Sequence, residues 1–215
     1  MSNQGTLLVV SGFSGAGKGT VVNAIMNTYD DYALSVSATT RKPREGEIDG
    51  VSYFFKTTDE FKSMIDNNEL LEYANYVGNY YGTPKSYVEN KLRDGYNVIL
   101  EIESVGAFNV KKIFPEAVLT FIIPPSADEL ERRLRGRGTE EDAVIKARLA
   151  KACTEAEGVE NYDYIVVNEN VSDCVSEIND IAHRVPEILE RCMTSHNIDK
   201  VNKIRQELEK FSKGE

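Results

Sequence analysis

The sequence predicts an α/β fold in which a parallel sheet carries helices on both faces. Short apolar runs alternate with longer segments of helical periodicity, which is the pattern of repeated strand–helix units. The apolar runs are rich in Val, Ile and Leu, as expected for strands that are covered on both sides. A length of 215 residues with 41% hydrophobic residues suits one such domain with inserted segments.

The core elements follow from these patterns in chain order. The apolar runs predict four core strands, at residues 6–11, 98–102, 119–123 and 164–167. The longer periodic segments predict five helices, at residues 18–27, 84–94, 126–135, 140–157 and 171–192. In such a sheet the carboxyl ends of the strands border the crevice where ligands bind.

Residues 35–83 differ from the rest because they are polar, tyrosine-rich and rich in turns. The expected elements are a short strand, a helix and the two strands of a hairpin, at residues 51–55, 58–67, 70–77 and 80–83. The hairpin turn is expected at Gly78-Asn79. The simplest account is a small mixed β unit inserted into the core.

Residues 195–215 form a charged tail whose apolar residues recur at helical spacing, at Val201, Ile204, Leu208 and Phe211. We expect a short helix there, packed on the body of the protein or on a partner subunit. The state of assembly, monomer or homo-oligomer, stays open.

The composition excludes several classes of protein. A net charge of −10 argues against a general nucleic-acid binder, which is usually basic. No apolar run approaches the roughly 20 residues that span a bilayer, and the first residues lack the character of a signal peptide, so a cytoplasmic protein without a membrane partner is expected. Cys153, Cys174 and Cys192 are widely spaced and odd in number, which favours reduced, packed thiols.

One loop carries the clearest functional pattern. Its residues lie between the first apolar run and the first predicted helix: Gly12, Phe13, Ser14, Gly15, Ala16, Gly17, Lys18, Gly19 and Thr20. Glycines let successive backbone N–H groups turn toward phosphate oxygens, and the following helix adds its positive N-terminus. Lys18 then reaches the β- and γ-phosphates of a nucleotide. The alternative is a glycine-rich turn that binds nothing. In that case the order of strand, glycine-rich loop, lysine and helix would be a coincidence.

The residue after the lysine departs from the usual phosphate-binding pattern, in which a Ser or Thr hydroxyl contacts magnesium. Here it is Gly19, and the next hydroxyl, on Thr20, lies about 100° further around the helix. Thr20 therefore does not simply replace the usual Ser or Thr, and its role as a magnesium ligand stays open. The Gly-Lys-Gly-Thr form resembles that of nucleoside monophosphate kinases, which implies that phosphates and waters hold most of the metal.

A second dense cluster follows, Ser37-Ala38-Thr39-Thr40-Arg41-Lys42-Pro43-Arg44, with Tyr53, Glu72 and Asn79 to Thr83 downstream. With Glu101, Pro124-Pro125-Ser126, Arg133 to Glu140 and Val167-Asn168, this pattern closely resembles the guanylate kinases over roughly residues 8–190. The resemblance implies a fold like that of the P-loop nucleoside triphosphate hydrolases, with an inserted GMP-binding subdomain and a helical lid.

The same resemblance implies a domain organisation. A guanylate kinase-like domain is expected over residues 1–194, followed by a C-terminal helical extension over 195–215. Within the domain we expect a core at residues 5–34, 84–128 and 161–194, a GMP-binding insert at 35–83 and a lid at 129–160.

The resemblance assigns GMP binding to Ser37, Arg41, Arg44, Tyr53, Glu72, Tyr81, Thr83 and Glu103. Guanine presents two adjacent donors, N1–H and the N2 amino group, and an ionised Glu72 accepts from both, whereas adenine offers an acceptor at N1. Hydroxyls on Ser37 and Thr83 are expected to donate toward guanine O6. Arg41 and Arg44 supply guanidinium forks for the phosphate dianion, and the tyrosine hydroxyls add neutral donors. Taken alone, this arginine pair would be read as a solvated basic loop.

For ATP, the resemblance adds Arg133, Arg137 and Asn168 to the loop residues 12–20. The implied catalytic residues are Lys18, Arg41, Arg137 and Arg148, with Glu101 holding Mg²⁺ through water beside Glu103 on the same side of a strand end. The implied reaction is ATP + GMP = ADP + GDP, with dGMP as a further acceptor, in purine nucleotide metabolism. Positioning and cationic clamps supply the acceleration of such an in-line phosphoryl transfer.

Two other functions are compatible with parts of the pattern. A guanylate-kinase-like interaction module would use the GMP site to bind a phosphopeptide, and the complete phosphate loop disfavours it. A kinase for another phosphorylated small molecule is disfavoured by Glu72 with Ser37 and Thr83. Release of ADP from ATP in the presence of GMP, and a panel of acceptors, separate these functions.

The phosphate loop generates a first prediction. Lys18→Ala should nearly abolish turnover and leave GMP binding largely intact, because the ammonium serves the phosphates of ATP and the migrating group. Initial rates and GMP titrations of the variant check this. Near-normal turnover would remove the assignment of the phosphate loop.

Overall fold

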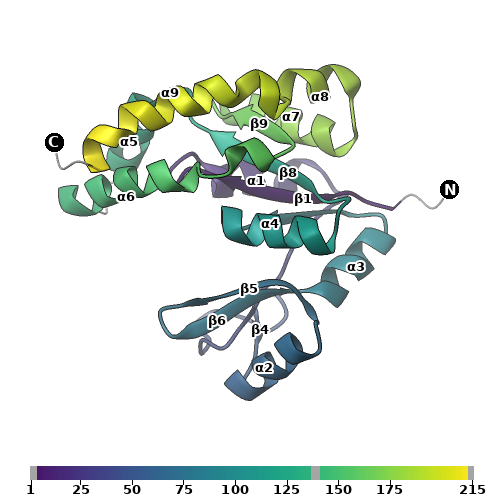
Figure 1. Ribbon diagram of the computed structural model, residues 1–215. Helices are drawn as coiled ribbons and strands as arrows, with labels where there is room; N and C mark the ends of the chain where they lie inside the picture. Colours follow the sequence, from purple (N-terminus) through teal and green to yellow (C-terminus); the bar gives the residue numbers. More distant parts are fainter. Residues whose placement is uncertain (1–3, 137–140, 213–215) are drawn as a thin grey trace.

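The core is a five-stranded parallel sheet in the order β2-β7-β1-β8-β9. The computed structural model describes residues 4–136 and 141–212 (Figure 1). In the centre of the sheet, Val9 pairs with Leu100 on one side and Leu119 on the other, and all three are fully buried. The predicted α/β fold is therefore confirmed. The strands are β1 (Leu7–Gly12), β2 (Tyr32–Leu34), β7 (Asn97–Glu101), β8 (Val118–Ile123) and β9 (Tyr164–Val167).

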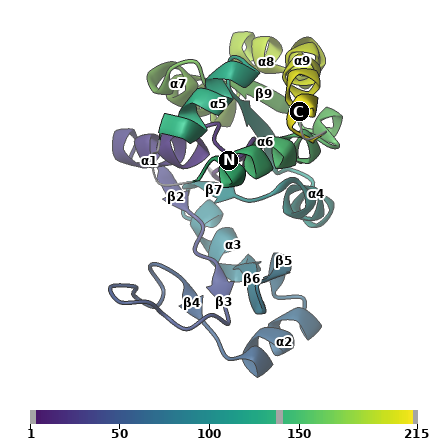
Figure 2. The same ribbon diagram turned by 90° about the vertical axis from the view of Figure 1, so that its left-hand side faces the viewer.

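Helices cover both faces of this sheet (Figure 2). α1 (Lys18–Thr28) and α7 (Val171–Ala182) lie together on one side, and α4 (Ser104–Ile113) and α6 (Asp142–Glu155) lie on the other. Each buries an apolar stripe against the strands, as the helical periodicity requires. The remaining helices are α3 (Lys85–Arg93), α5 (Ala127–Gly136), a 3₁₀ turn η1 (Val159–Asn161), α8 (Pro186–Cys192) and α9 (Thr194–Ser212).

The insert forms a second sheet of its own, below the main sheet in Figure 1, in the order β4-β3-β6-β5. Its small core contains Ala38, Phe61 and Leu70, and the Phe61 ring stacks on Tyr80 at 5.3 Å between centroids. Thr57 caps the helix through a reciprocal bond with Glu60. The elements are β3 (Ala38–Thr39), β4 (Phe54–Phe55), α2 (Thr58–Asp66), β5 (Leu70–Tyr76) and β6 (Asn79–Pro84).

Two details of the insert differ from the sequence-based expectation. The hairpin turn is Val77-Gly78 rather than Gly78-Asn79, with φ of 48° and 76°. Two left-handed residues match the twist of a tight hairpin, and the exposed Val77 accepts this conformation. The strand expected over 51–55 is limited to Phe54–Phe55, because the residues before it form a turn.

The helix predicted over residues 171–192 is two helices. α7 ends at Ala182 and α8 begins at Pro186, with Arg184 at a φ of 57° between them. Proline has no N–H to donate and disfavours helical geometry in the residue before it, so the chain turns at this point. The periodic pattern continued through the proline and concealed the break.

The C-terminal helix α9 is longer than expected and packs on the body of the protein. Val201, Ile204 and Leu208 are buried, and α9 runs across α6 and the edge strand β9 (Figure 1). The Cys153 thiol of α6 lies 3.8 Å from the Arg205 carbonyl oxygen of α9. The three cysteines are free, and two of them are buried. Among the described residues, we find no helix with the length and apolar character needed to cross a membrane.

The packing of α9 generates a second prediction. Leu208→Ala should lower the free energy of unfolding by about 2–5 kcal/mol, because it leaves a cavity under a fully buried side chain. Urea denaturation measures the change, and the exposed Gln206→Ala on the same helix serves as the control, with an expected change within about 0.5 kcal/mol. Equal stability of the two variants would contradict the observed packing of α9.

Candidate active site

The predicted phosphate loop connects β1 to α1 and curls tightly. Gly12 has a φ of 145°, and a Cβ there would lie 2.1 Å from the Ile122 carbonyl oxygen of the neighbouring strand. Gly17 precedes α1 with a φ of 92°. Both positions favour glycine, because other residues rarely adopt these positive φ angles. At Gly12 a side chain would also clash with the backbone of Ile122. The loop therefore has the backbone shape that points N–H groups at an anion.

Lys18 lies within the curl of this loop. Its ammonium donates to the carbonyl oxygens of Gly12 at 2.8 Å and Phe13 at 3.1 Å. Burial lowers the pKa of Lys18, and the carboxylates of Glu155 and Glu101 oppose that shift. The cation is thus held in place beside the loop by two carbonyls, where a phosphate oxygen can reach it.

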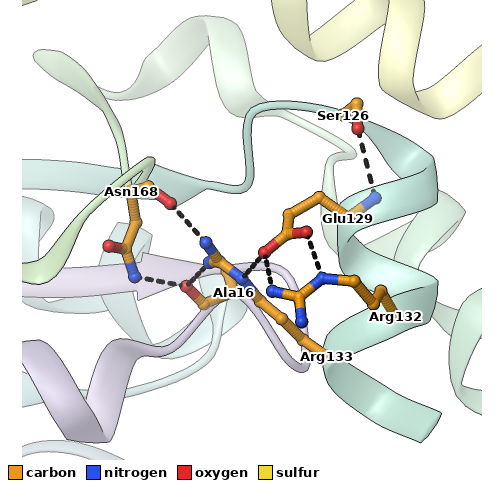
Figure 3. A network of polar contacts seen from close by, with 6 residues as sticks. All are labelled: Ala16, Ser126, Glu129, Arg132, Arg133 and Asn168. Carbon is orange, nitrogen blue, oxygen red and sulfur yellow. Dashed lines mark hydrogen bonds and ion pairs between the residues drawn. The ribbon is translucent and has the colours of Figure 1, made fainter. Parts of the chain in front are cut away.

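A network of polar contacts holds the loop from the other side (Figure 3). The Ala16 carbonyl oxygen accepts from Asn168 Nδ2 at 2.7 Å and from Arg133 Nη1 at 3.2 Å. Arg133 also donates from Nη2 to the Asn168 carbonyl at 2.8 Å and from Nε to Glu129 at 2.8 Å. Arg132 donates to the same carboxylate, and the two arginines lower the pKa of Glu129 to about 2. The predicted ATP residues Arg133 and Asn168 are therefore bonded to the loop itself.

Acidic and basic side chains line a cavity of about 420 Å³ that opens beside Lys18. Its walls include Glu101 at the end of β7, Glu103 just beyond it, and Lys151 and Glu155 on α6. Lys151 pairs with Glu103 at 3.0 Å, and Glu155 accepts the Ser14 N–H at 2.6 Å. The α6 helix is thereby joined to the phosphate loop and to the end of β7.

The insert contributes a half-buried carboxylate, Glu72 on β5. The Thr83 hydroxyl donates to Glu72 Oε1 at 2.7 Å, and burial raises the pKa of the carboxyl. Sequence reasoning expected Thr83 to donate toward guanine O6. In the structure the Thr83 hydroxyl donates to Glu72, a bond that orients the carboxylate, and its contact with guanine O6 stays a prediction.

Three of the residues that are predicted to bind the GMP phosphate lie together in the insert. The Arg41 guanidinium lies over the Tyr53 ring, 5.2 Å from its centroid, and the rings of Tyr53 and Tyr81 meet edge to face at 6.1 Å. Arg44 is exposed three residues further along the same loop. Ser37 lies at the start of this strand region, where its carbonyl accepts the Phe54 N–H.

Comparisons with known proteins identify the family. The guanylate kinase family model matches residues 4–185. The chain is 53% identical to the guanylate kinase of Bacillus subtilis over 182 residues, 84% of this chain and 89% of that protein. It is 46% identical to that of Caldanaerobacter subterraneus over 207 residues, 96% and 98% of the two chains. The crystal structure of guanylate kinase from Anaplasma phagocytophilum matches with a TM-score of 0.61 at 33% identity, over 85% of this chain and 86% of that one.

The chain belongs to the guanylate kinase family. It is therefore a phosphotransferase, as the sequence predicted, and the parallel sheet is that of the P-loop kinases. The family match ends before α8, so α8 and α9 extend beyond it.

The structure describes one of the two remaining predicted catalytic arginines, Arg148, and not the other, Arg137. Arg148 is half-buried on α6, three residues before Lys151 and seven before Glu155, so the three share one helix face. Arg137 lies outside the residues that the structure describes. Its predicted role is unchanged by the structure.

The predicted magnesium ligands differ in their placement. Glu101 lies beside Lys18, and a Cβ atom at Gly19 would lie 3.8 Å from its Oε2 atom. Thr20 is exposed one residue further around α1. Within the described part of the chain, no cluster of three His, Cys, Asp or Glu side chains is arranged to hold a metal ion. The assignments of magnesium to Glu101 and to Thr20 both stay predictions.

Sequence reasoning missed four charged residues that pair with predicted site residues: Glu47, which pairs with Arg41 at 2.7 Å, Glu129, Lys151 and Glu155. Three of them could have been found from helical spacing. Glu129 lies four residues before Arg133, and Lys151 lies four residues before Glu155 beside the buried stripe of α6. Glu47 lies in a loop without periodicity, so no pattern in the sequence marks it.

The Ala16 network generates a third prediction. Asn168→Ala should lower the free energy of unfolding by about 1–3 kcal/mol and weaken ATP binding more than GMP binding, because it removes the shorter bond to a loop carbonyl. Denaturation and nucleotide titrations check this, with the exposed neighbour Glu169→Ala as the control. Unchanged ATP affinity with an intact fold would mean that the loop keeps its shape without Asn168.

Proposed function

We propose that the chain transfers the γ-phosphoryl group of ATP to GMP, and to dGMP, and releases ADP and GDP. The observation that carries the proposal is the placement of Glu72 with Thr83 in the insert, across from a phosphate loop with its lysine in the core. Glu72 and Thr83 are suited to recognise a base, and the phosphate loop with Lys18 is suited to bind a polyphosphate. The family assignment supports the same reaction.

Guanine specificity follows from the chemistry of Glu72. An ionised carboxylate accepts the two donors on the guanine edge, and the Thr83 hydroxyl orients this carboxylate by donating to Oε1. Adenine would put an acceptor against one carboxylate oxygen and leave a half-buried charge poorly paired, which costs about 1–3 kcal/mol. Base recognition is therefore assigned to this pair.

The acceptor phosphate is assigned to Arg41, Arg44, Tyr53 and Tyr81. The guanidinium over the tyrosine ring, with a second arginine and two phenol hydroxyls nearby, suits a dianion. An oxygen of the GMP phosphate then attacks the γ-phosphorus of ATP in line. The bond to the bridging oxygen breaks, and ADP leaves with the electron pair. Lys18 holds the phosphates of ATP during the transfer.

Magnesium is assigned to Glu101, whose carboxylate suits a metal held through water. Burial raises the pKa of Glu101 and the Lys18 charge opposes this, so the carboxylate has a cationic neighbour already. The ion would supply charge neutralisation between the phosphates of ATP.

We assign the lid to residues 129–160 and the GMP-binding insert to residues 35–83, within a domain of residues 1–194. The insert has its own sheet and its own small core, which supports its treatment as a unit. Arg133, Arg137 and Arg148 belong to the lid segment and are assigned to the phosphates of ATP and of the transition state. α9 packs against α6 within that segment, and the extension over 195–215 is assigned to its support.

The base-reading role generates a fourth prediction. Glu72→Gln replaces one carboxylate oxygen by an NH₂ donor, which faces a guanine donor. GMP should bind more weakly by about 1–3 kcal/mol, and the preference for GMP over AMP should narrow. ATP affinity should hardly change, because other segments form that site.

The measurement is ADP release with GMP or AMP as acceptor, with Glu69→Gln on the exposed start of the same hairpin as the control. Full retention of the preference for GMP in Glu72→Gln would exclude this residue as the reader of the base. Failure of the unmodified chain to release ADP with GMP would overturn the proposed function as a whole.

A further inference from the structure

Arg41, assigned above to the acceptor phosphate, already has a carboxylate partner. Glu47 lies six residues further along the loop and accepts from Arg41 Nη2 at 2.7 Å and from Nη1 at 3.0 Å. The two side chains are only 15% and 21% exposed. Glu47 also accepts the backbone N–H of Arg44 at 2.7 Å. One carboxylate therefore holds both arginines of the predicted phosphate site, one by its side chain and the other by its backbone.

Among the described residues, these charged and carbonyl partners do not use the whole guanidinium, and the Tyr81 hydroxyl is a further, neutral partner of it. Glu47 takes one N–H from each terminal nitrogen, and the second N–H of Nη1 is directed at the Lys42 carbonyl at 2.9 Å. Arginine has five N–H groups, so Nε–H and the second N–H of Nη2 remain. These two lie parallel on one edge, and a parallel pair of donors is the arrangement that binds phosphate in a bidentate manner.

The plane of the guanidinium is also held. Tyr53 lies against its face at 5.2 Å, and Tyr81 packs edge to face on Tyr53. Hydrogen bonding to Glu47 raises the pKa of Arg41, with a smaller contribution from the Tyr81 hydroxyl. The carboxylate is itself held ionised, since Arg41 and the Arg44 N–H lower the pKa of Glu47 to about 2. Glu47 thus stays charged, and the Arg41 side chain is held by both its edge and its face.

We propose that Glu47 is a positioning residue for the acceptor phosphate. It turns Arg41 so that the Nε–Nη2 edge faces the phosphate of GMP, and it ties the Arg44 backbone to the same carboxylate. This inference rests on the proposed function, because it concerns how GMP is held. Glu47 needs no contact with the nucleotide, and its whole effect passes through the two arginines.

Replacement of Glu47 has two opposite effects on the affinity for GMP, so the direction of the change tests the proposal. A carboxylate near the phosphate repels it, so the loss of the Glu47 charge alone would strengthen GMP binding, by about five-fold for charges 4 Å apart in water. Loss of positioning would instead weaken GMP binding by about 10-fold or more, the equivalent of one charge-assisted hydrogen bond. The proposal requires that weakening dominate.

The experiment compares Glu47→Gln with Glu45→Gln, an exposed glutamate two residues earlier in the same loop. Glu47→Gln keeps the size of the side chain but turns an NH₂ group toward an arginine donor. We expect the KM for GMP to rise about 10-fold or more, with kcat at saturating GMP and the KM for ATP changed by less than about two-fold. Guanosine, which lacks the phosphate, should inhibit competitively against GMP with an unchanged inhibition constant. Glu45→Gln should leave all four values as they are.

A second variant tests whether the effect passes through Arg41. In the background of Arg41→Lys, which lacks the guanidinium edge, Glu47→Gln should raise the KM for GMP by less than about three-fold, because coupled residues are not additive. An unchanged or lower KM for GMP in Glu47→Gln would overturn the proposal. So would an equal loss of guanosine and GMP, or full additivity with Arg41→Lys. The unmodified chain is assayed beside them, and its failure to phosphorylate GMP would count against the proposed function rather than against Glu47.

Discussion

The carbonyl oxygen of Ala16 is the point on which the ATP side of the site depends. It accepts from Asn168 just after β9 and from Arg133 on α5, so one backbone atom joins the phosphate loop, the end of β9 and α5 (Figure 3). A phosphate loop binds by its N–H groups, and these keep their direction only if the carbonyls on the other side of the peptide planes are held. Glu129 fixes Arg133 in turn, which carries the restraint to the start of α5.

Paired charges recur among the predicted site residues of a chain whose net charge is −10. Arg41 is held by Glu47, Arg133 by Glu129 and Lys151 by Glu103, while Lys18 lies near Glu101 and Glu155. A flexible cation loses side-chain entropy when it binds a phosphate, and a carboxylate partner that orients it beforehand reduces that loss. These acidic residues are therefore compatible with two anionic substrates, because they orient the cations that are predicted to bind them.

The helices and strands that the sequence predicted are longer, and have clearer hydrophobic patterns, than those that it did not predict. The four core strands and the main helices have long apolar or periodic patterns, and their type was predicted correctly. The three residues of β2 and the two of β3 are too short for any pattern to emerge. In α4, Gly106 stands in the first turn and Val105 is 75% exposed, so the apolar stripe is interrupted where the helix begins. These segments are ordered by the sheet edges and strands against which they pack.

The sequence by itself determined the phosphate loop, the residue types of the two nucleotide sites and the class of sheet. These are local properties, since a glycine's dihedral, a helix period or a strand's apolar run depends on neighbours along the chain. Only the tertiary structure decided which carboxylate meets which donor. Ser14 and Glu155 are 141 residues apart, and Ala16 and Asn168 are 152 apart. Contacts over such separations arise when strands β1, β8 and β9 align in one sheet, and no local pattern encodes the partner that each polar group will meet.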